Sequence, residues 1–168
     1  GNLYGEIPSK ILNVGESQAE EALIWWKEQF GSDFYLELMR HKQEDENRVN
    51  QTLIAFAKKH NVKLIATNNT YYVNKEDANA HDILLCVKDG EKQATPIGRG
   101  RGYRYGLPNQ EYYFKSGDEM KQLFADLPEA IINIQEIIDK TEPYSLYRDV
   151  LLPKFEIPDE FEVEEDKI

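Results

Sequence analysis

The chain has 168 residues, of which 40% are hydrophobic and 30% charged, and its formal net charge at pH 7 is −11. This length and apolar content predict one soluble domain, or a large piece of one, with a buried core. The negative charge argues against a surface that binds nucleic acid through clustered lysine and arginine. Because no apolar run is long enough to span a bilayer and no leader peptide is seen, we expect a cytoplasmic location and no membrane partner.

In chain order, the first predicted element is a helix over about 16–29, begun by a capping box of Ser17 and Glu20 and ended by Gly31. A strand over 33–39, a helix over 44–60 and a strand over 63–67 follow, separated by short connections. This alternation of helix and strand predicts an α/β fold with parallel neighbouring strands.

The second half of the chain is less regular. Asn74 is expected to cap a helix that runs to about Cys86, and glycine, proline and charge then predict an irregular loop over 88–110. A short strand over 112–114 precedes a capping box of Ser116 and Glu119. Two helices, to about residue 124 and from Pro128 onward, form a helical subregion over 116–141, and 142–168 is expected to be an extended acidic connection.

Familiar catalytic motifs are missing from this sequence. The three histidines, His41, His60 and His81, form no pair with metal-ligand spacing, and there is no Asp-x-Asp pair, phosphate loop or nucleophile elbow. The single cysteine, Cys86, excludes an internal disulfide and is expected to be a small buried residue. Residue chemistry alone therefore indicates an α/β domain without an evident activity.

Two stretches remain as candidate sites. The residues from Thr67 to Tyr72 follow a strand, where α/β proteins place ligands, but they offer amides and phenols. In the loop, Arg99, Arg101 and Arg104 alternate with glycine and tyrosine. This composition favours a mobile solvated loop, with a nucleic-acid contact as the alternative.

Several segments in order resemble one known family. They are 1–8 (GNLYGEIP), 34–41 (FYLELMRH), 66–69 (ATNN), 80–86 (AHDILLC), 113–116 (YFKS) with 119–120 (EM), and 152–155 (LPKF). Together they closely resemble the alpha-subunit family of bacterial DNA polymerase III, in the later part of its polymerase-and-histidinol-phosphatase (PHP) domain and the start of the connection to the palm. The resemblance covers nearly the whole chain.

The resemblance implies a partial (β/α)7 PHP-type barrel. Residues 1–115 would be the C-terminal portion of the PHP domain, 116–141 its helical subregion, and 142–168 the connection toward the palm. It implies that the intact subunit carries out template-directed DNA synthesis with Mg²⁺ held elsewhere, and that this segment needs no cofactor. The implied partners are the rest of the alpha subunit and, in some members, a proofreading exonuclease subunit; DNA would be bound only through the intact subunit.

The resemblance also locates former metal-ligand positions. Where metal-binding members have a cysteine, an aspartate and a histidine, this chain has Asn2, Asn69 and Tyr71. A neutral amide brings no charge to a cation, and a phenol with a pKa near 10 must first lose a proton to ligate one. We therefore expect a vestigial site, no catalytic residue in this segment and a non-catalytic scaffold role.

Two alternatives stay open. Glu37, His41 and His81, with residues outside this chain, could rebuild a polar site, which would make the protein a metal-dependent phosphoesterase or 3′–5′ exonuclease of the PHP family. Strand edges that an absent half of the barrel would cover also favour self-association of the fragment.

Overall fold

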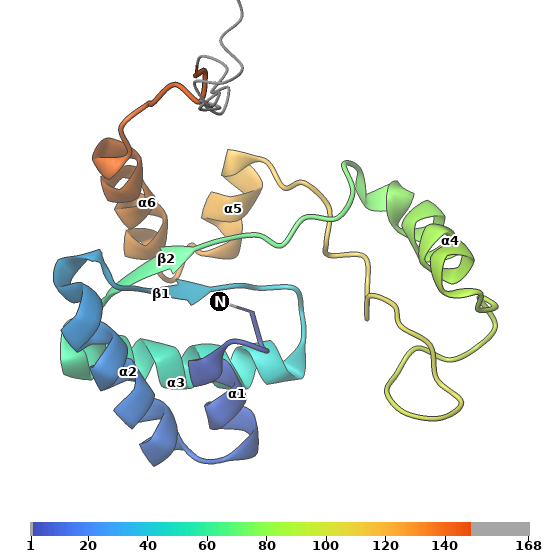
Figure 1. Cartoon of the computed structure of the whole chain (residues 1–168), viewed down its shortest axis with the longest axis horizontal. Helices are drawn as coiled ribbons and strands as arrows, with labels where there is room; N and C mark the ends of the chain where they lie inside the picture. The colour runs from blue at the N-terminus through green and yellow to red at the C-terminus, as the bar shows by residue number, and fades with distance from the viewer. Residues whose placement is uncertain (1, 149–168) are drawn as a thin grey trace, which may run out of the picture.

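The computed structural model describes residues 2–148 of the chain. The predicted extended segment beyond residue 148 therefore lies outside the described residues. Within the described part, the elements are α1 (Glu6–Asn13), α2 (Glu16–Phe30), η1 (Gly31–Asp33), β1 (Tyr35–Leu38), α3 (Glu44–His60), β2 (Lys63–Ala66), η2 (Lys75–Asp77), α4 (Ala78–Asp89), α5 (Gly117–Leu123) and α6 (Pro128–Lys140). Figure 1 shows a body built around the strands and a separate arm that carries α4.

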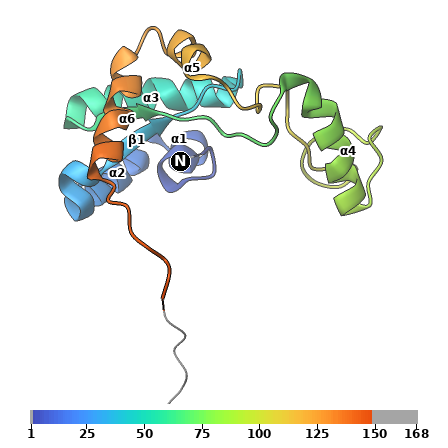
Figure 2. The same ribbon diagram turned by 90° about the horizontal axis from the view of Figure 1, so that it is seen from above.

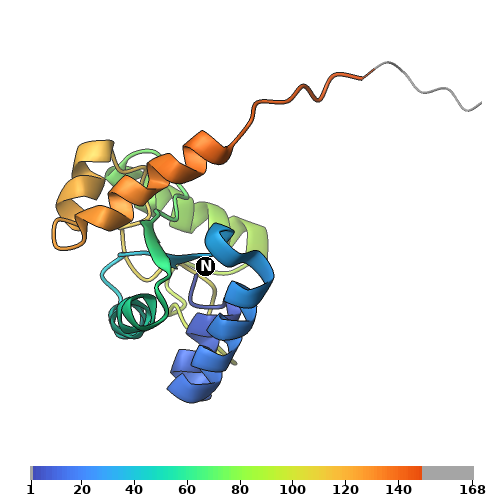
Figure 3. The same ribbon diagram turned by 90° about the vertical axis from the view of Figure 1, so that its left-hand side faces the viewer.

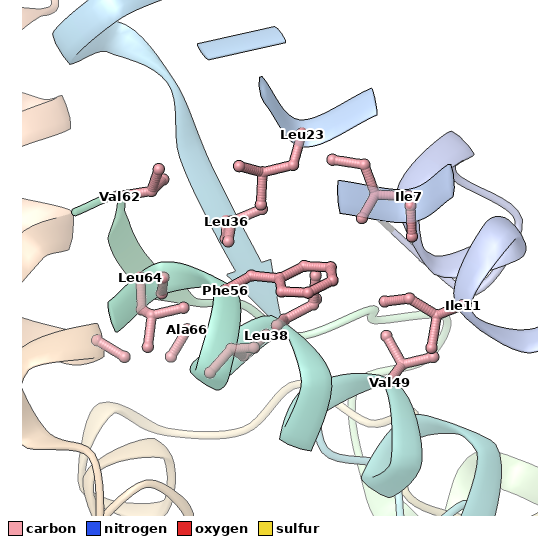
Figure 4. Packing of buried hydrophobic residues seen from close by; sticks show 14 of the residues in the cluster. Ile7, Ile11, Leu23, Leu36, Leu38, Val49, Phe56, Val62, Leu64 and Ala66 are labelled. Atoms are coloured by element: carbon pink, nitrogen blue, oxygen red, sulfur yellow. The ribbon is translucent and has the colours of Figure 1, made fainter. Parts of the chain in front are cut away.

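The two strands β1 and β2 pair in parallel, which confirms the prediction from the helix and strand order. Tyr35 is opposite Lys63, and Leu38 is opposite Ala66. Alternate residues of both strands are buried, as a period of two requires when one face of a sheet meets a core. Figure 4 shows these side chains converging with those of α1, α2 and α3.

Helices cover both sides of this small sheet. Figures 1 and 3 show α1, α2 and α3 on one side and α5 and α6 on the other. Leu23, Leu38 and Phe124 are fully buried within the resulting core. On α6, Asn133 Nδ2 donates a hydrogen bond of 2.9 Å to the Leu64 carbonyl, so this helix satisfies a backbone acceptor of β2.

The arm, residues 78–110, extends away from the body (Figure 2). It comprises α4 and the irregular loop that the glycine and proline content predicts. Two chain segments link it to the body, and they are joined by an isolated parallel bridge between Tyr72 and Tyr113. Cys86 on α4 is 7% exposed, which confirms its expected burial.

Several predicted elements are confirmed closely. The helix predicted over 44–60 is α3, whose Val49, Leu53 and Phe56 face the core. Ser116 caps α5 by accepting from the Glu119 amide at 3.3 Å, while the Glu119 carboxylate accepts from the Ser116 amide at 2.8 Å.

Other details of the prediction are wrong. The N-cap of α2 is Gly15, and no side chain caps this helix, because it begins at Glu16 and places Ser17 inside its first turn. Helix α1 is not among the predicted elements; its Pro8 lies in the first turn, where a helix tolerates proline. The strand predicted over 112–114 is reduced to the single bridge at Tyr113.

The fold class is mixed α and β, with a small parallel sheet. Two paired strands within residues 2–148 do not by themselves make a barrel. In the same part of the chain, every helix is too short or too polar to cross a membrane.

Candidate functional site

The three positions expected to be vestigial line one cavity. Asn2, Asn69 and Tyr71 surround a space of about 140 Å³ at the junction of body and arm. Its remaining lining residues are Leu3, Tyr4, Met39, Gln43, Glu46, Tyr105, Gly106, Leu107, Pro108 and Tyr112. We call this space the tyrosine cavity, because four phenol rings border it.

The ends of the two strands position this cavity. Met39 follows β1, and the chain after β2 continues the ladder by one bond, in which the Thr67 amide donates to the Leu38 carbonyl at 3.0 Å. Asn69 and Tyr71 therefore lie past the carboxyl end of β2, where a parallel sheet commonly holds its functional side chains. Tyr105 enters from the arm, and Tyr112 enters from residues 111–116, which lead from the arm back to α5 and which we call the return segment.

A buried histidine, His41, pairs with a buried carboxylate, Glu46, next to the cavity. Glu46 accepts from the His41 backbone amide at 2.5 Å, and its other oxygen lies 2.8 Å from His41 Nδ1. His41 Nε2 accepts a bond of 3.3 Å from the Asn69 amide. The imidazole also stacks on the Tyr112 ring, with centroids 4.4 Å apart. All polar atoms of the ring are thus engaged within the protein.

Two phenols of the cavity, Tyr105 and Tyr112, have a raised pKa. Burial, together with the nearby Glu46 carboxylate, raises the pKa of Tyr112. Burial and a hydrogen bond with Tyr71 likewise raise the pKa of Tyr105. The Tyr112 hydroxyl also accepts a 2.5 Å bond from Gln43 Nε2. At neutral pH these two phenols, and the amides of Asn2 and Asn69, therefore present neutral groups to the cavity.

Comparison with curated proteins gives a consistent result, although no family model matches the chain. The chain is 39% identical over 158 residues to the DNA polymerase III subunit alpha of Borreliella burgdorferi, covering 94% of this chain and 13% of that protein. It is 40% identical to the same subunit of Campylobacter jejuni, covering 83% of this chain and 11% of the relative. The Treponema pallidum subunit is 31% identical over 97% of the chain, or 14% of its own length.

The chain belongs to the DNA polymerase III alpha-subunit family. It spans only 11–14% of the length of these relatives and so corresponds to one segment of an alpha subunit. This confirms the family that the sequence motifs indicate.

The donor set of the tyrosine cavity does not fit the metal cluster that the resemblance to PHP-containing alpha subunits implies. Glu46 is the cavity's carboxylate, and both of its oxygens already contact His41. Within residues 2–148, no group of three or more histidine, cysteine, aspartate or glutamate side chains is arranged to hold a metal ion. Neutral amides and phenols are weak ligands for the divalent ions that such clusters bind.

The three residues of the candidate residual site are not brought together in this alpha-subunit segment. Glu37 accepts a 2.6 Å bond from Thr67 Oγ1 and lines two other cavities. His41 is 1% exposed and bonded to Glu46. His81 lies on α4, with its ring 5.5 Å from those of Tyr71 and Tyr72. The proposed polar site of Glu37, His41 and His81 stays a prediction, and these three residues do not line a common cavity in the described part of the chain.

The three loop arginines have different surroundings. Arg104 is 6% exposed and binds Asp82 through two bonds of 2.6 and 2.9 Å, which lowers the pKa of that carboxyl. Arg99 donates to the Tyr4 hydroxyl at 2.6 Å and lies over its ring, while Arg101 is exposed. The nucleic-acid contact stays a prediction, and the burial of Arg104 counts against that residue taking part.

Sequence reasoning missed the remaining lining residues of the cavity, among them the polar side chains of Tyr4, Gln43, Glu46, Tyr105 and Tyr112. Glu46 stands in the first turn of α3, where a carboxylate is expected on electrostatic grounds alone. Glu46 lies on the same face of that helix as the buried Val49 and Leu53, and this position was the available signal. A carboxylate on a buried face needs a partner, so it would have pointed to a polar contact there.

Proposed function

We propose that this chain is a non-catalytic structural segment of the PHP domain of a bacterial replicative polymerase alpha subunit. The observation that carries this proposal is the convergence of Asn2, Asn69 and Tyr71 on one cavity. The resemblance assigns a metal ligand to each of these positions in metal-binding members. Their clustering supports a former metal site whose ligands have been replaced together.

The contacts around the cavity support a structural role. His41, Glu46 and Tyr112 are each less than 10% exposed and satisfy one another through bonding or stacking. Such a network fixes the connections after β1 and β2 and attaches the return segment from the arm. Because buried polar groups are costly without partners, the network holds these segments in one arrangement.

An open edge of the sheet, along β1, supports the partial PHP barrel. Within residues 2–148, β1 has β2 as its one strand partner. A cavity of about 240 Å³ runs along consecutive β1 residues, Tyr35, Leu36 and Glu37, and is also lined by Ile7 and Trp26. A further strand of a barrel, supplied by a longer polypeptide, would cover this groove and pair with the free edge.

The intact subunit would then be a DNA-directed DNA polymerase that uses Mg²⁺ at palm carboxylates outside this chain. The segment's principal partner would be the rest of the alpha subunit, palm included. A proofreading exonuclease subunit is a second proposed partner, for which the overall negative charge suits a protein-facing surface better than a DNA-facing one.

Elemental analysis of the full-length subunit, purified without chelator, tests the proposal. We expect no zinc or manganese bound in stoichiometric amounts, because the cavity offers neutral donors. Two or three metal ions per chain would contradict the scaffold role. If nucleotide or phosphate release were then abolished by chelator, the phosphoesterase or exonuclease alternative would replace it.

A further inference from the structure

Three lysines surround one carboxylate where the arm joins the body. Glu111 Oε1 lies 2.7 Å from Lys42 Nζ and 3.2 Å from Lys75 Nζ. Lys115 Nζ lies 3.9 Å from the other oxygen and donates to the Glu111 backbone carbonyl. We call these four residues the lysine cluster. Its members come from the connection after β1, from η2 and from the return segment before α5.

The charges of the lysine cluster do not balance. Three ammonium groups face the Glu111 carboxylate, an excess of two positive charges over that one group in a chain whose net charge is −11. Glu119 is a further carboxylate near Lys115, and its oxygens accept bonds from the neutral Tyr113 hydroxyl and Ser116, so it keeps its negative charge and offsets one of the two. One positive charge remains in excess. Because ammonium groups at one oxygen repel each other, an additional anion would stabilise the arrangement.

Two of the lysines are open to solvent and one is not. The side chains of Lys42 and Lys75 are 68% and 43% exposed, whereas that of Lys115 is 4% exposed. Since Lys42 and Lys75 contact the same carboxylate oxygen, their ammonium groups lie next to each other. An anion approaching from solvent would therefore meet both, with the charge of Lys115 beneath them.

The backbone holds Lys42 in an unusual conformation. Its φ angle of 56° lies in the left-handed region, which residues other than glycine seldom adopt. The preceding carbonyl, of His41, accepts a 2.6 Å bond from Asn109 Nδ2 and so fixes this turn to the end of the arm. Such conformations often occur where a side chain must be presented in one direction. Here the turn directs Lys42 toward Glu111.

We propose that the lysine cluster binds a phosphate group, either in a nucleic-acid backbone or free in solution. Phosphate oxygens accept charge-assisted hydrogen bonds from several ammonium groups at once, which suits adjacent lysines with excess charge. The site is separate from the tyrosine cavity and from the loop arginines. It does not depend on whether the subunit binds metal, and so it goes beyond the proposed scaffold role.

Inorganic phosphate is the first probe. The unfolding midpoint of the chain is measured against phosphate concentration, with chloride keeping the ionic strength constant. The test variant is K42M/K75M, and the matched control is K88M/K121M, which removes two exposed lysines that pair with Asp89 and Asp118 elsewhere. Phosphate should raise the midpoint of the parent and the control, and roughly tenfold more should be needed for K42M/K75M.

The substitution Glu111→Gln should change phosphate binding in the opposite direction to K42M/K75M. Removing the Glu111 carboxylate leaves Lys42 and Lys75 without the counter-charge they share, so this variant should bind phosphate more tightly than the parent does. Equal phosphate responses in the parent, K42M/K75M and the control would overturn the proposal, as would the absence of any response in the parent.

A single-stranded DNA oligonucleotide without terminal phosphate distinguishes the two sources. If the site binds a nucleic-acid backbone, K42M/K75M should weaken oligonucleotide binding by the subunit. The slope of log affinity against log salt should then fall by about 0.7 for each backbone phosphate that the variant no longer binds. If only the inorganic phosphate response depends on the two lysines, free phosphate is the ligand. If neither probe distinguishes K42M/K75M from the control, there is no phosphate site.

Discussion

His41 and Glu46 are held together in the interior by two contacts, one from the backbone amide and one from the ring nitrogen, at 2.5 and 2.8 Å. Both residues are less than 10% exposed. Glu46→Ala would leave the amide and the imidazole without their acceptor. We expect it to lower the free energy of unfolding by about 3 kcal/mol, measured by urea denaturation. Glu44→Ala, at an exposed site in the same helical turn, should change it by less than about 0.5 kcal/mol.

Two buried tyrosines should respond oppositely to removal of the hydroxyl. Within residues 2–148, Tyr72 Oη is a buried polar atom with no hydrogen-bond partner. Tyr72→Phe should therefore leave the free energy of unfolding unchanged or raise it by up to about 1 kcal/mol. Tyr112→Phe should lower it by about 1 kcal/mol, because Gln43 loses its acceptor. A larger decrease for Tyr72→Phe than for Tyr112→Phe in thermal or urea unfolding would contradict this assignment.

Glu136 makes stability depend on pH. Hydrogen bonds from Lys63, Tyr35 and Lys140 lower the pKa of Glu136 from 4.5 to about 2. A lowered native pKa stabilises the fold above pH 4.5, and this stabilisation is lost as the pH falls toward 2. Glu136→Gln should therefore reduce the pH dependence of the thermal unfolding midpoint between pH 4.5 and pH 2. Glu129→Gln, in the first turn of the same helix, is the control and should keep the parent's slope.

Restoring the three ligands should create metal affinity. Asn2→Cys, Asn69→Asp and Tyr71→His place a thiol, a carboxylate and an imidazole around one cavity. We expect this triple variant to bind one zinc ion by elemental analysis and to gain thermal stability with zinc. A control with the same exchanges at exposed positions, N13C/N79D/Y147H, should do neither. Equal zinc content in both variants would show that residues 2, 69 and 71 are not close enough to bind one ion together.

Elements with strong local signals were predictable from the sequence. The helix α3 was predicted from its regular apolar face, and its acidic first turn and basic last turn agree with the same bounds. The capping box at Ser116 was correct because Glu119 returns the bond to the cap residue. A similar pattern at Ser17 failed, because Gly15 turns the chain earlier and α2 starts before the pattern does.

The candidate site was predictable only in part. Family resemblance grouped Asn2, Asn69 and Tyr71, and the structure places them around one cavity. Tyr105 and Tyr112 line the same cavity because the chain folds back from the arm to the body. No local sequence pattern predicts that this fold-back brings them to the cavity. The bond between Arg104 and Asp82 likewise joins residues 22 positions apart and gave no signal in the spacing. Contacts of this kind depend on tertiary packing.

The narrow attachment of the arm has a consequence for local unfolding. The main contact of α4 with another element is with η2, and Ile83, Leu84 and Val87 on this helix are 45–74% exposed. Helix α3, by contrast, buries its apolar face in the core. The amides of α4 should therefore exchange with deuterium at a lower opening free energy than those of α3. The chain would then behave as two cooperative units, and the Tyr72–Tyr113 bridge would lie at the boundary between them.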